Sequence, residues 1–106
     1  MEMSNDTTSR IAAFLDAGYE AKTLLAMARE GAAIEAIAKE ARRLIERHVE
    51  KSTGDSLSCD LAMHALRSVE WFEIAQMFLD EVQSDREYAA IASGENFYSK
   101  YIYSNA

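Results

Sequence analysis

The sequence contains no proline, one cysteine and only four glycines in 106 residues. One cysteine cannot form an intramolecular disulfide, so no covalent cross-link within the chain is expected. There is no uninterrupted apolar run of about eighteen residues, the length that a membrane-spanning helix needs. There is also no basic and apolar leader at the start of the chain. We therefore expect one soluble domain, residues 1–106, in a reducing cytoplasm.

Sequence motifs for catalysis are missing as well. The chain has no Gly-x-Ser-x-Gly elbow, no phosphate-binding glycine loop and no Cys-x-x-Cys or His-x-x-x-His pair. Asp60 and His64 are four residues apart and supply half of a metal site at most. Cys59 is more typical of a small buried apolar residue than of a nucleophile. We predict no catalytic residue, no metal and no cofactor, and metal uptake by Asp60 and His64 would overturn this.

Apolar residues make up 49% of the chain and recur at helical spacing. Strict alternation is absent and β-branched residues are sparse, so strands are not expected. The predicted fold is all-α, a compact single-domain bundle of about five to six helices. The predicted helical segments are 6–17, 19–30, 32–51, 58–83 and a short helix from 84 to about 94. Gly31 either separates the second segment from the third or lies inside one longer helix.

The third segment shows the clearest amphipathic pattern. Its charged residues fall outside an apolar arc of roughly 140° and include the pairs Glu35–Lys39 and Arg42–Glu46. His48 belongs to the apolar arc and is expected to be a packed core residue. The arc consists of Ile34, Ile37, Ala38, Ala41, Leu44, Ile45, His48 and Val49.

The fourth segment, near 58–83, is predicted to be a long central helix that packs on two sides. Its apolar residues cover well over half of the circumference. They are Leu61, Ala65, Val69, Phe72, Ala75, Leu79 and Val82, with a neighbouring stripe of Trp71, Ile74 and Phe78. The residues from Ser84 to Glu87 then match a capping box, which predicts the start of a new helix. That helix is expected to end near Gly94.

The formal charge of −7 is unevenly distributed along the chain. Residues 52–106 hold nine acidic and three basic residues, whereas residues 30–51 hold five of each. Four acids of the predicted central helix lie within roughly 100° of one another, with Met63, Leu66 and Met77 in the same sector. This sector predicts a surface for a basic partner, although a merely solvated face would have the same charge. The predicted partner-binding residues are Glu70, Glu73, Met77, Asp80, Glu81, Asp85 and Glu87.

Aromatic residues are concentrated in the segment 97–103, which contains Phe97, Tyr98, Tyr101 and Ile102. Two interpretations stay open for this segment. It closes the core as a lid, or it forms an exposed patch for a partner or for self-association.

With its acidic sector of Glu70, Glu73, Asp80 and Glu81, the chain resembles the small, acidic, all-helical anti-CRISPR proteins of phages and mobile elements. Those directed against type I systems are the most similar in overall character. The resemblance implies a non-enzymatic inhibitor in the cytoplasm of a bacterial host. Its partner would be a basic nucleic-acid-binding protein, the Cascade complex or its recruited helicase–nuclease. It implies no direct contact with nucleic acid or membrane, which is also expected because an acidic chain repels both.

An alternative from another class is a small helical adaptor or self-assembling protein. Its interface would be apolar and would combine the aromatic tail with the stripe from Trp71 to Phe78. The expected oligomeric state is a monomer or a weak dimer.

Overall fold

The computed structural model describes the backbone of residues 3–104 and the side chains of residues 3–89. Within these residues it has five α-helices, one 3₁₀ turn and no strand, so the prediction of an all-α bundle is confirmed. The elements are α1 (Asp6–Ala17), α2 (Glu20–Arg29), α3 (Ile34–Ser52), α4 (Ser56–Ala65), η1 (Leu66–Ser68) and α5 (Trp71–Ser104).

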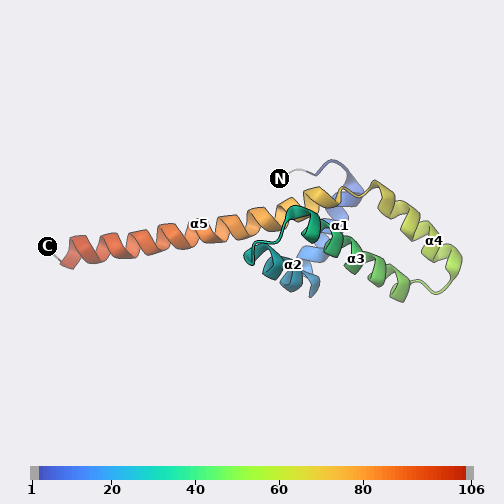
Figure 1. The fold of residues 1–106 in the computed structure, drawn as a ribbon, viewed down its shortest axis with the longest axis horizontal. Helices are drawn as coiled ribbons and strands as arrows, with labels where there is room; N and C mark the ends of the chain where they lie inside the picture. The colour runs from blue at the N-terminus through green and yellow to red at the C-terminus, as the bar shows by residue number, and fades with distance from the viewer. Residues whose placement is uncertain (1–2, 105–106) are drawn as a thin grey trace.

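The helices form a packed body from which α5 extends as a long rod (Figure 1). The N-terminal part of α5 packs against α1, α2 and α3, and its most extensive contacts are with α3. Helix α4 packs on α3 and has no fully buried residue of its own. The molecule measures 72 × 24 × 22 Å. The C-terminal part of α5 accounts for the long dimension, because it continues beyond the other helices.

The core lies where α1, α2, α3 and α5 meet. Its largest fully buried apolar side chains are Leu15, Leu24, Ile37, Ile74 and Phe78, which come from all four helices. A fully buried side chain of this size contributes about 1.5–3 kcal/mol relative to an exposed one. The body is therefore held together mainly by apolar burial among these four helices.

Helix α3 buries Ile37, Ala38, Ala41 and Ile45, as its apolar spacing predicts. The placement of His48 in the core is wrong, because His48 is exposed. Its ring lies against the ring of Phe14, with centroids 4.8 Å apart. Leu44 and Val49 of the same arc are partly buried against the core, so the arc packs around His48 without covering it.

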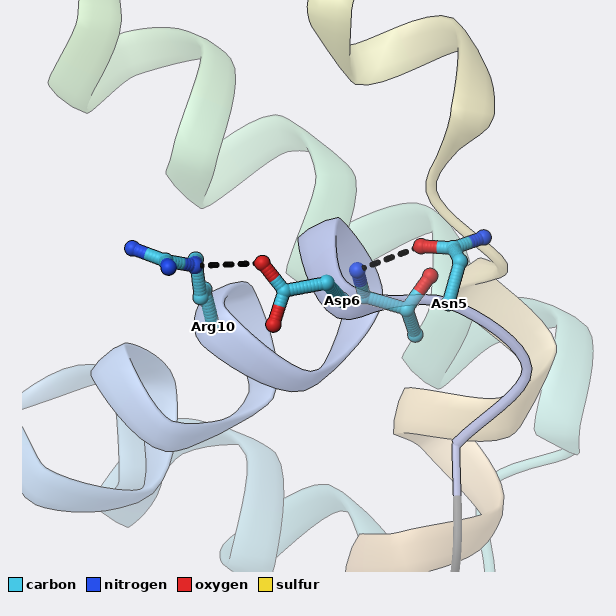
Figure 2. A network of polar contacts seen from close by, with 4 residues as sticks. Asn5, Asp6 and Arg10 are labelled. Atoms are coloured by element: carbon cyan, nitrogen blue, oxygen red, sulfur yellow. Dashed lines mark hydrogen bonds and ion pairs between the residues drawn. The ribbon is translucent and has the colours of Figure 1, made fainter.

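Helix α1 begins at the predicted residue for a local reason. Asn5 is the N-cap, and its side-chain oxygen accepts a hydrogen bond from the backbone N–H of Thr8 at 2.8 Å. One turn later, Arg10 pairs with Asp6 at 2.7 Å on the exposed side of the helix (Figure 2). These contacts lie within a few residues of one another, which is why the sequence alone predicts this helix well.

Gly31 separates α2 from α3, which settles the question whether these are one helix or two. Gly31 has φ of 84°, a left-handed conformation that other residues adopt only at a cost. Its backbone N–H donates to the Ala28 carbonyl, and the next N–H, of Ala32, donates to Met27. The chain thus reverses direction in a tight turn and enters α3 without a side-chain cap.

The prediction of one helix over 58–83 is wrong. Helix α4 ends at Ala65, η1 covers Leu66–Ser68, and the backbone of Val69 is extended before α5 begins at Trp71. The break also redistributes the apolar residues predicted to be buried. Ile74, Ala75, Phe78 and Val82 are buried in α5, whereas Leu61 is 63% exposed and Phe72 is 54% exposed.

Residues near the N-terminus stabilise this break. The Asn5 side-chain amide donates to the Ser68 carbonyl at 2.9 Å, and the Glu70 backbone N–H donates to the Thr8 hydroxyl at 3.0 Å. Thr8 is fully buried. The Ser4 backbone N–H donates to the Glu73 carboxylate at 2.8 Å, and the Ser4 hydroxyl donates to the same group. Backbone groups left unpaired by the break therefore find partners more than sixty residues away.

Beyond the break, α5 is continuous. The predicted start of a new helix at Ser84–Glu87 is wrong, because these residues lie inside α5. The predicted helix end near Gly94 is also wrong, because Gly94 lies inside α5 too. The backbone of 97–103 is helical as part of α5. The two interpretations of this segment, a lid or an interface, concern the side chains of 97–103, which lie outside the described residues.

Candidate functional site

One face of α5 carries acidic residues at a regular spacing. Glu73, Asp80 and Glu87 are seven residues apart, which places them two turns or about 10.5 Å apart along the helix. They point away from the buried residues Phe78 and Val82. Asp80 and Glu87 are exposed, and Glu73 is half-buried. We call Glu73, Asp80 and Glu87 the acidic face.

Glutamine side chains orient two of these carboxylates. The Gln76 amide donates to Asp80 Oδ1 at 2.8 Å, and the Gln83 amide donates to Glu87 Oε1 at 3.1 Å. Each pair spans four residues, or one helical turn. A neutral amide holds a carboxylate in place without cancelling its charge, so the acidic face stays negative. This Gln-x-x-x-acid repeat is not among the predicted motifs, although its seven-residue period is visible in the sequence.

Glu73 differs from the other two because it has a partner in the body. The Ser4 hydroxyl and, next, the Ser4 backbone N–H donate to its carboxylate, and these bonds lower the pKa of Glu73 below its ordinary value of 4.5. The carboxylate is therefore ionised at neutral pH. However, its main contacts fix the N-terminal segment to α5, so a structural role for Glu73 accompanies any role in binding.

Glu81 lies on the side of α5 that approaches α1. Burial, and then the negative charge of Asp16, raise the pKa of Glu81 above 4.5. Asp85 also contributes to this effect, and Arg29 opposes it. Glu81 is half-buried and is less available to a partner than Asp80 or Glu87, whereas Asp85 is exposed.

The predicted acidic sector is thus only partly assembled. Glu70 is exposed but precedes α5, and Met63 and Leu66 belong to α4 and η1. They do not continue one helical face with Asp80, as the uninterrupted helix implied. Met77 is on α5 but is half-buried and packs against the core. Of the seven predicted binding residues, Asp80 and Glu87 are exposed on one side of α5, Asp85 is exposed on another side, and Glu70 and Glu73 lie near the start of the helix.

Two of the four acids of α3, Glu40 and Glu46, have basic partners within their own helix. Arg42 pairs with Glu46 at 2.6 Å, which confirms one predicted pair, and Arg43 pairs with Glu40 at 2.6 Å. The predicted Glu35–Lys39 pair is not among the ion pairs of the described side chains. None of the ion pairs among residues 3–89 involves α5.

Asp60 and His64 line a hollow of about 440 Å³ between α3 and α4, together with Arg42, Glu46 and Arg67. The two cationic arginines make this lining a poor match for a metal ion. Over the part of the chain that is described, no cluster of three or more His, Cys, Asp or Glu is placed to hold a metal. Cys59 is half-buried.

A second hollow, of about 300 Å³, opens between α2 and α3 and was not found from the sequence. Its charged residues are mainly basic, because Arg47 and Lys51 line it with a single acid, Glu20. Lys22 lies beside it, with its ammonium 5.9 Å from the ring centre of Tyr19. We call this hollow the basic cleft; its described lining is Tyr19, Glu20, Thr23, Leu44, Arg47, His48 and Lys51.

Among the described helices, none has an apolar stretch long enough to cross a membrane. Comparison with family models, with curated proteins and with solved structures gives no match for this chain.

Proposed function

We propose that this chain is a non-enzymatic protein-binding inhibitor that presents the acidic face of α5 to a basic surface of its partner. The observation that carries the proposal is the pair of exposed carboxylates, Asp80 and Glu87, which glutamines orient and no described basic residue neutralises. Such groups increase the rate of encounter with a cationic protein and fix the register of the complex.

The spacing of the acids indicates how such a surface competes with nucleic acid. Duplex DNA carries one charge per ~1.7 Å of its axis, whereas the acidic face carries one carboxylate per ~10.5 Å. The face is therefore suited to binding a few arginines or lysines that would otherwise contact phosphates. It is too sparse to imitate an extended duplex. A type I CRISPR effector, the partner class implied by the resemblance to anti-CRISPR proteins, has such a nucleic-acid-binding surface.

The test uses charge reversal at the two exposed positions, Asp80→Lys and Glu87→Lys, in one variant. Glu73 and Glu81 are left intact because both contact other parts of the body. Purified type I Cascade and its helicase–nuclease are the first partners to assay, with DNA-binding inhibition as the readout. The variant should inhibit at least about tenfold less well, and inhibition by the parent should weaken with salt.

The matched control is Glu50→Lys with Asp60→Lys, an equal change of charge at exposed residues outside α5. It should inhibit like the parent. Equal inhibition by the α5 variant and the parent would reject the acidic face as the binding surface. Circular dichroism and thermal unfolding of both variants establish that folding is unchanged.

The alternative adaptor function needs a different surface from the one predicted. Ile74 and Phe78 of the predicted stripe are fully buried, so they cannot form an interface. Helix α4 offers exposed apolar residues instead, since Leu57 is 67% exposed and Leu61 is 63% exposed. An adaptor that uses α4 would bind its partner with little dependence on salt. It would lose binding in Leu57→Ser with Leu61→Ser and keep it in the α5 charge reversal.

A further inference from the structure

We propose that the basic cleft between α2 and α3 receives the acidic part of α5 from a second copy of this chain, and that the exchange is reciprocal. The proposal does not depend on the identity of any other partner. It is based on two surfaces of the same chain whose charged residues have no ion-pair partner among residues 3–89.

The first surface is the basic cleft. Lys22 from α2 and Arg47 and Lys51 from α3 surround it, and none of them takes part in an ion pair among residues 3–89. Tyr19 is 86% exposed, and His48 at the other wall is exposed as well. The cleft thus combines positive charge with exposed ring surface, in a chain whose net charge is −7.

The second surface is the part of α5 around the point where it leaves the body. Asp80 and Glu87 are exposed there on one side of the helix, and Tyr88, next to that side, is 74% exposed. The last described contact with the body is a hydrogen bond from the Arg86 guanidinium to the Arg29 carbonyl at 2.7 Å. Beyond it, α5 continues clear of the other helices (Figure 1). A helix outside a folded body is marginal in water unless an apolar or charged surface covers one of its sides.

The two surfaces have opposite charges, and each includes an exposed tyrosine ring. Carboxylates of α5 would face Lys22, Arg47 and Lys51, and the Tyr88 ring would add contact area beside Tyr19. A two-fold arrangement places the α5 of each copy on the cleft of the other, so the interface forms twice. A second copy explains both surfaces at once, whereas a phosphate-bearing ligand would explain the cleft only.

The test relies on charge reversal in two separate variants. The cleft variant carries Lys22→Glu and Arg47→Glu, one from each wall, and the helix variant carries Asp80→Lys and Glu87→Lys. Light scattering after size exclusion should give the parent twice the mass of the 11.9 kDa chain. Each variant alone should have a dimer dissociation constant at least about 100-fold higher, because like charges then meet at both interfaces.

Mixing the two variants provides the decisive measurement. In the mixed dimer, the unchanged α5 meets the unchanged cleft, and the reversed α5 meets the reversed cleft. An equimolar mixture should therefore recover the dimer that neither variant forms alone. Lys39→Glu with Arg67→Glu, the same charge change outside the cleft, should leave the dimer intact.

Three outcomes would overturn the proposal: a parent that stays monomeric at millimolar concentration, a dimer that persists in both variants, or a mixture that stays monomeric. A fluorescently labelled phosphorylated oligonucleotide that binds the parent cleft, with no dimer in the parent, would assign the cleft to another ligand and reject the second copy. The cleft variant keeps α5 intact and releases it from the dimer, so it should inhibit a foreign basic partner at least as well as the parent does. Failure of the dimer is thus distinguishable from failure of the inhibitor function.

Discussion

Helices α3 and α5 both bury one side in the same core, but the carboxylates on their exposed sides have different partners. On α3, Arg42 and Arg43 neutralise Glu46 and Glu40 within one turn. On α5, Asp80 and Glu87 have glutamine partners, which leave the charge in place. The comparison teaches that net charge alone does not define a binding surface. A carboxylate is neutralised where it forms an ion pair with a base three or four residues away on the same helix, as Glu40 and Glu46 do.

The largest loss of stability should come from truncating a side chain of α5 that is buried in the core shared with α3. Phe78 is fully buried, so Phe78→Ala should lower the free energy of unfolding by about 3–5 kcal/mol. Urea unfolding followed by circular dichroism measures this loss. Phe72→Ala is the control, because Phe72 is 54% exposed and its removal should cost less than about 1 kcal/mol. Equal losses would mean that α5 is not anchored in the core through Phe78.

The two helices also differ in how they begin, and Thr8 tests this difference. Thr8→Val keeps the shape of the side chain but leaves the Glu70 backbone N–H without its acceptor. The expected cost is about 1–3 kcal/mol in the free energy of unfolding. Ser9→Ala, at an exposed position of the same helix, should change stability by less than about 0.5 kcal/mol. If Thr8→Val leaves the free energy of unfolding unchanged, the start of α5 does not depend on α1.

The start of α3 depends instead on the backbone of Gly31. Gly31→Ala should lower the free energy of unfolding by about 1 kcal/mol, because Gly31 has φ of 84°. Space is not the cause, since a Cβ at Gly31 would meet no atom within 4 Å. Gly54→Ala is the matched control: its position is equally open but has no positive φ, so it should be neutral or slightly stabilising. Thermal unfolding of both variants gives the comparison.

A basic residue placed on α5 should make it behave more like α3. Ser84 is exposed and lies four residues after Asp80, so Ser84→Lys supplies the missing partner. The gain in stability relative to Ser84→Gln should be about 0.2–0.5 kcal/mol and should fade at high salt. If lysine and glutamine have equal effects at low salt, Asp80 is already neutralised by another group.

The smallest predicted effect is the pH dependence of stability, to which Glu73 and Glu81 of α5 contribute with opposite signs. The pKa of Glu73 is lowered in the folded protein, so its stabilising contribution is present above 4.5 and is lost as pH falls through the lower folded value. The pKa of Glu81 is raised, so the folded state instead loses stability as pH rises from 4.5 through the higher folded value. Glu81→Gln should therefore increase stability at pH 7 by less than about 0.5 kcal/mol, and the increase should vanish near pH 4. Stability measured against pH for the parent and for Glu81→Gln tests the sign.

The sequence predicts the first three helices well because their determinants are local. Asn5 caps α1, and the spacing from Ile37 to Ile45 defines the buried side of α3. The boundary at Gly31 is one of two alternatives in the sequence, because a glycine is also tolerated inside a helix. Each of these signals acts within about one or two turns of the residue that carries it. No knowledge of the rest of the chain is needed to recognise them.

The break between α4 and α5 could not be predicted in this way. The apolar spacing runs through Ala65 and Val69 without a proline or glycine to interrupt it. The extended backbone there is stabilised by Asn5 and Thr8, which are more than sixty residues away in the sequence. The charge surplus of the second half was predictable from composition. The grouping of its acids was not, because the break removes Glu70 from the helical face of Asp80.

The contacts of Asn5 and Thr8 with the break also set an order for folding. The partners of residues 4–8 lie 62 to 69 residues further along the chain and are synthesised later. Local helices such as α1 and α3 can form while the ribosome is still adding residues, whereas this long loop closes only after Glu73 has emerged. Closure of residues 4–8 onto the start of α5 thus comes after the local helices have formed. Until that step is complete, a nascent chain has its local helices but lacks the contacts between residues 4–8 and the start of α5.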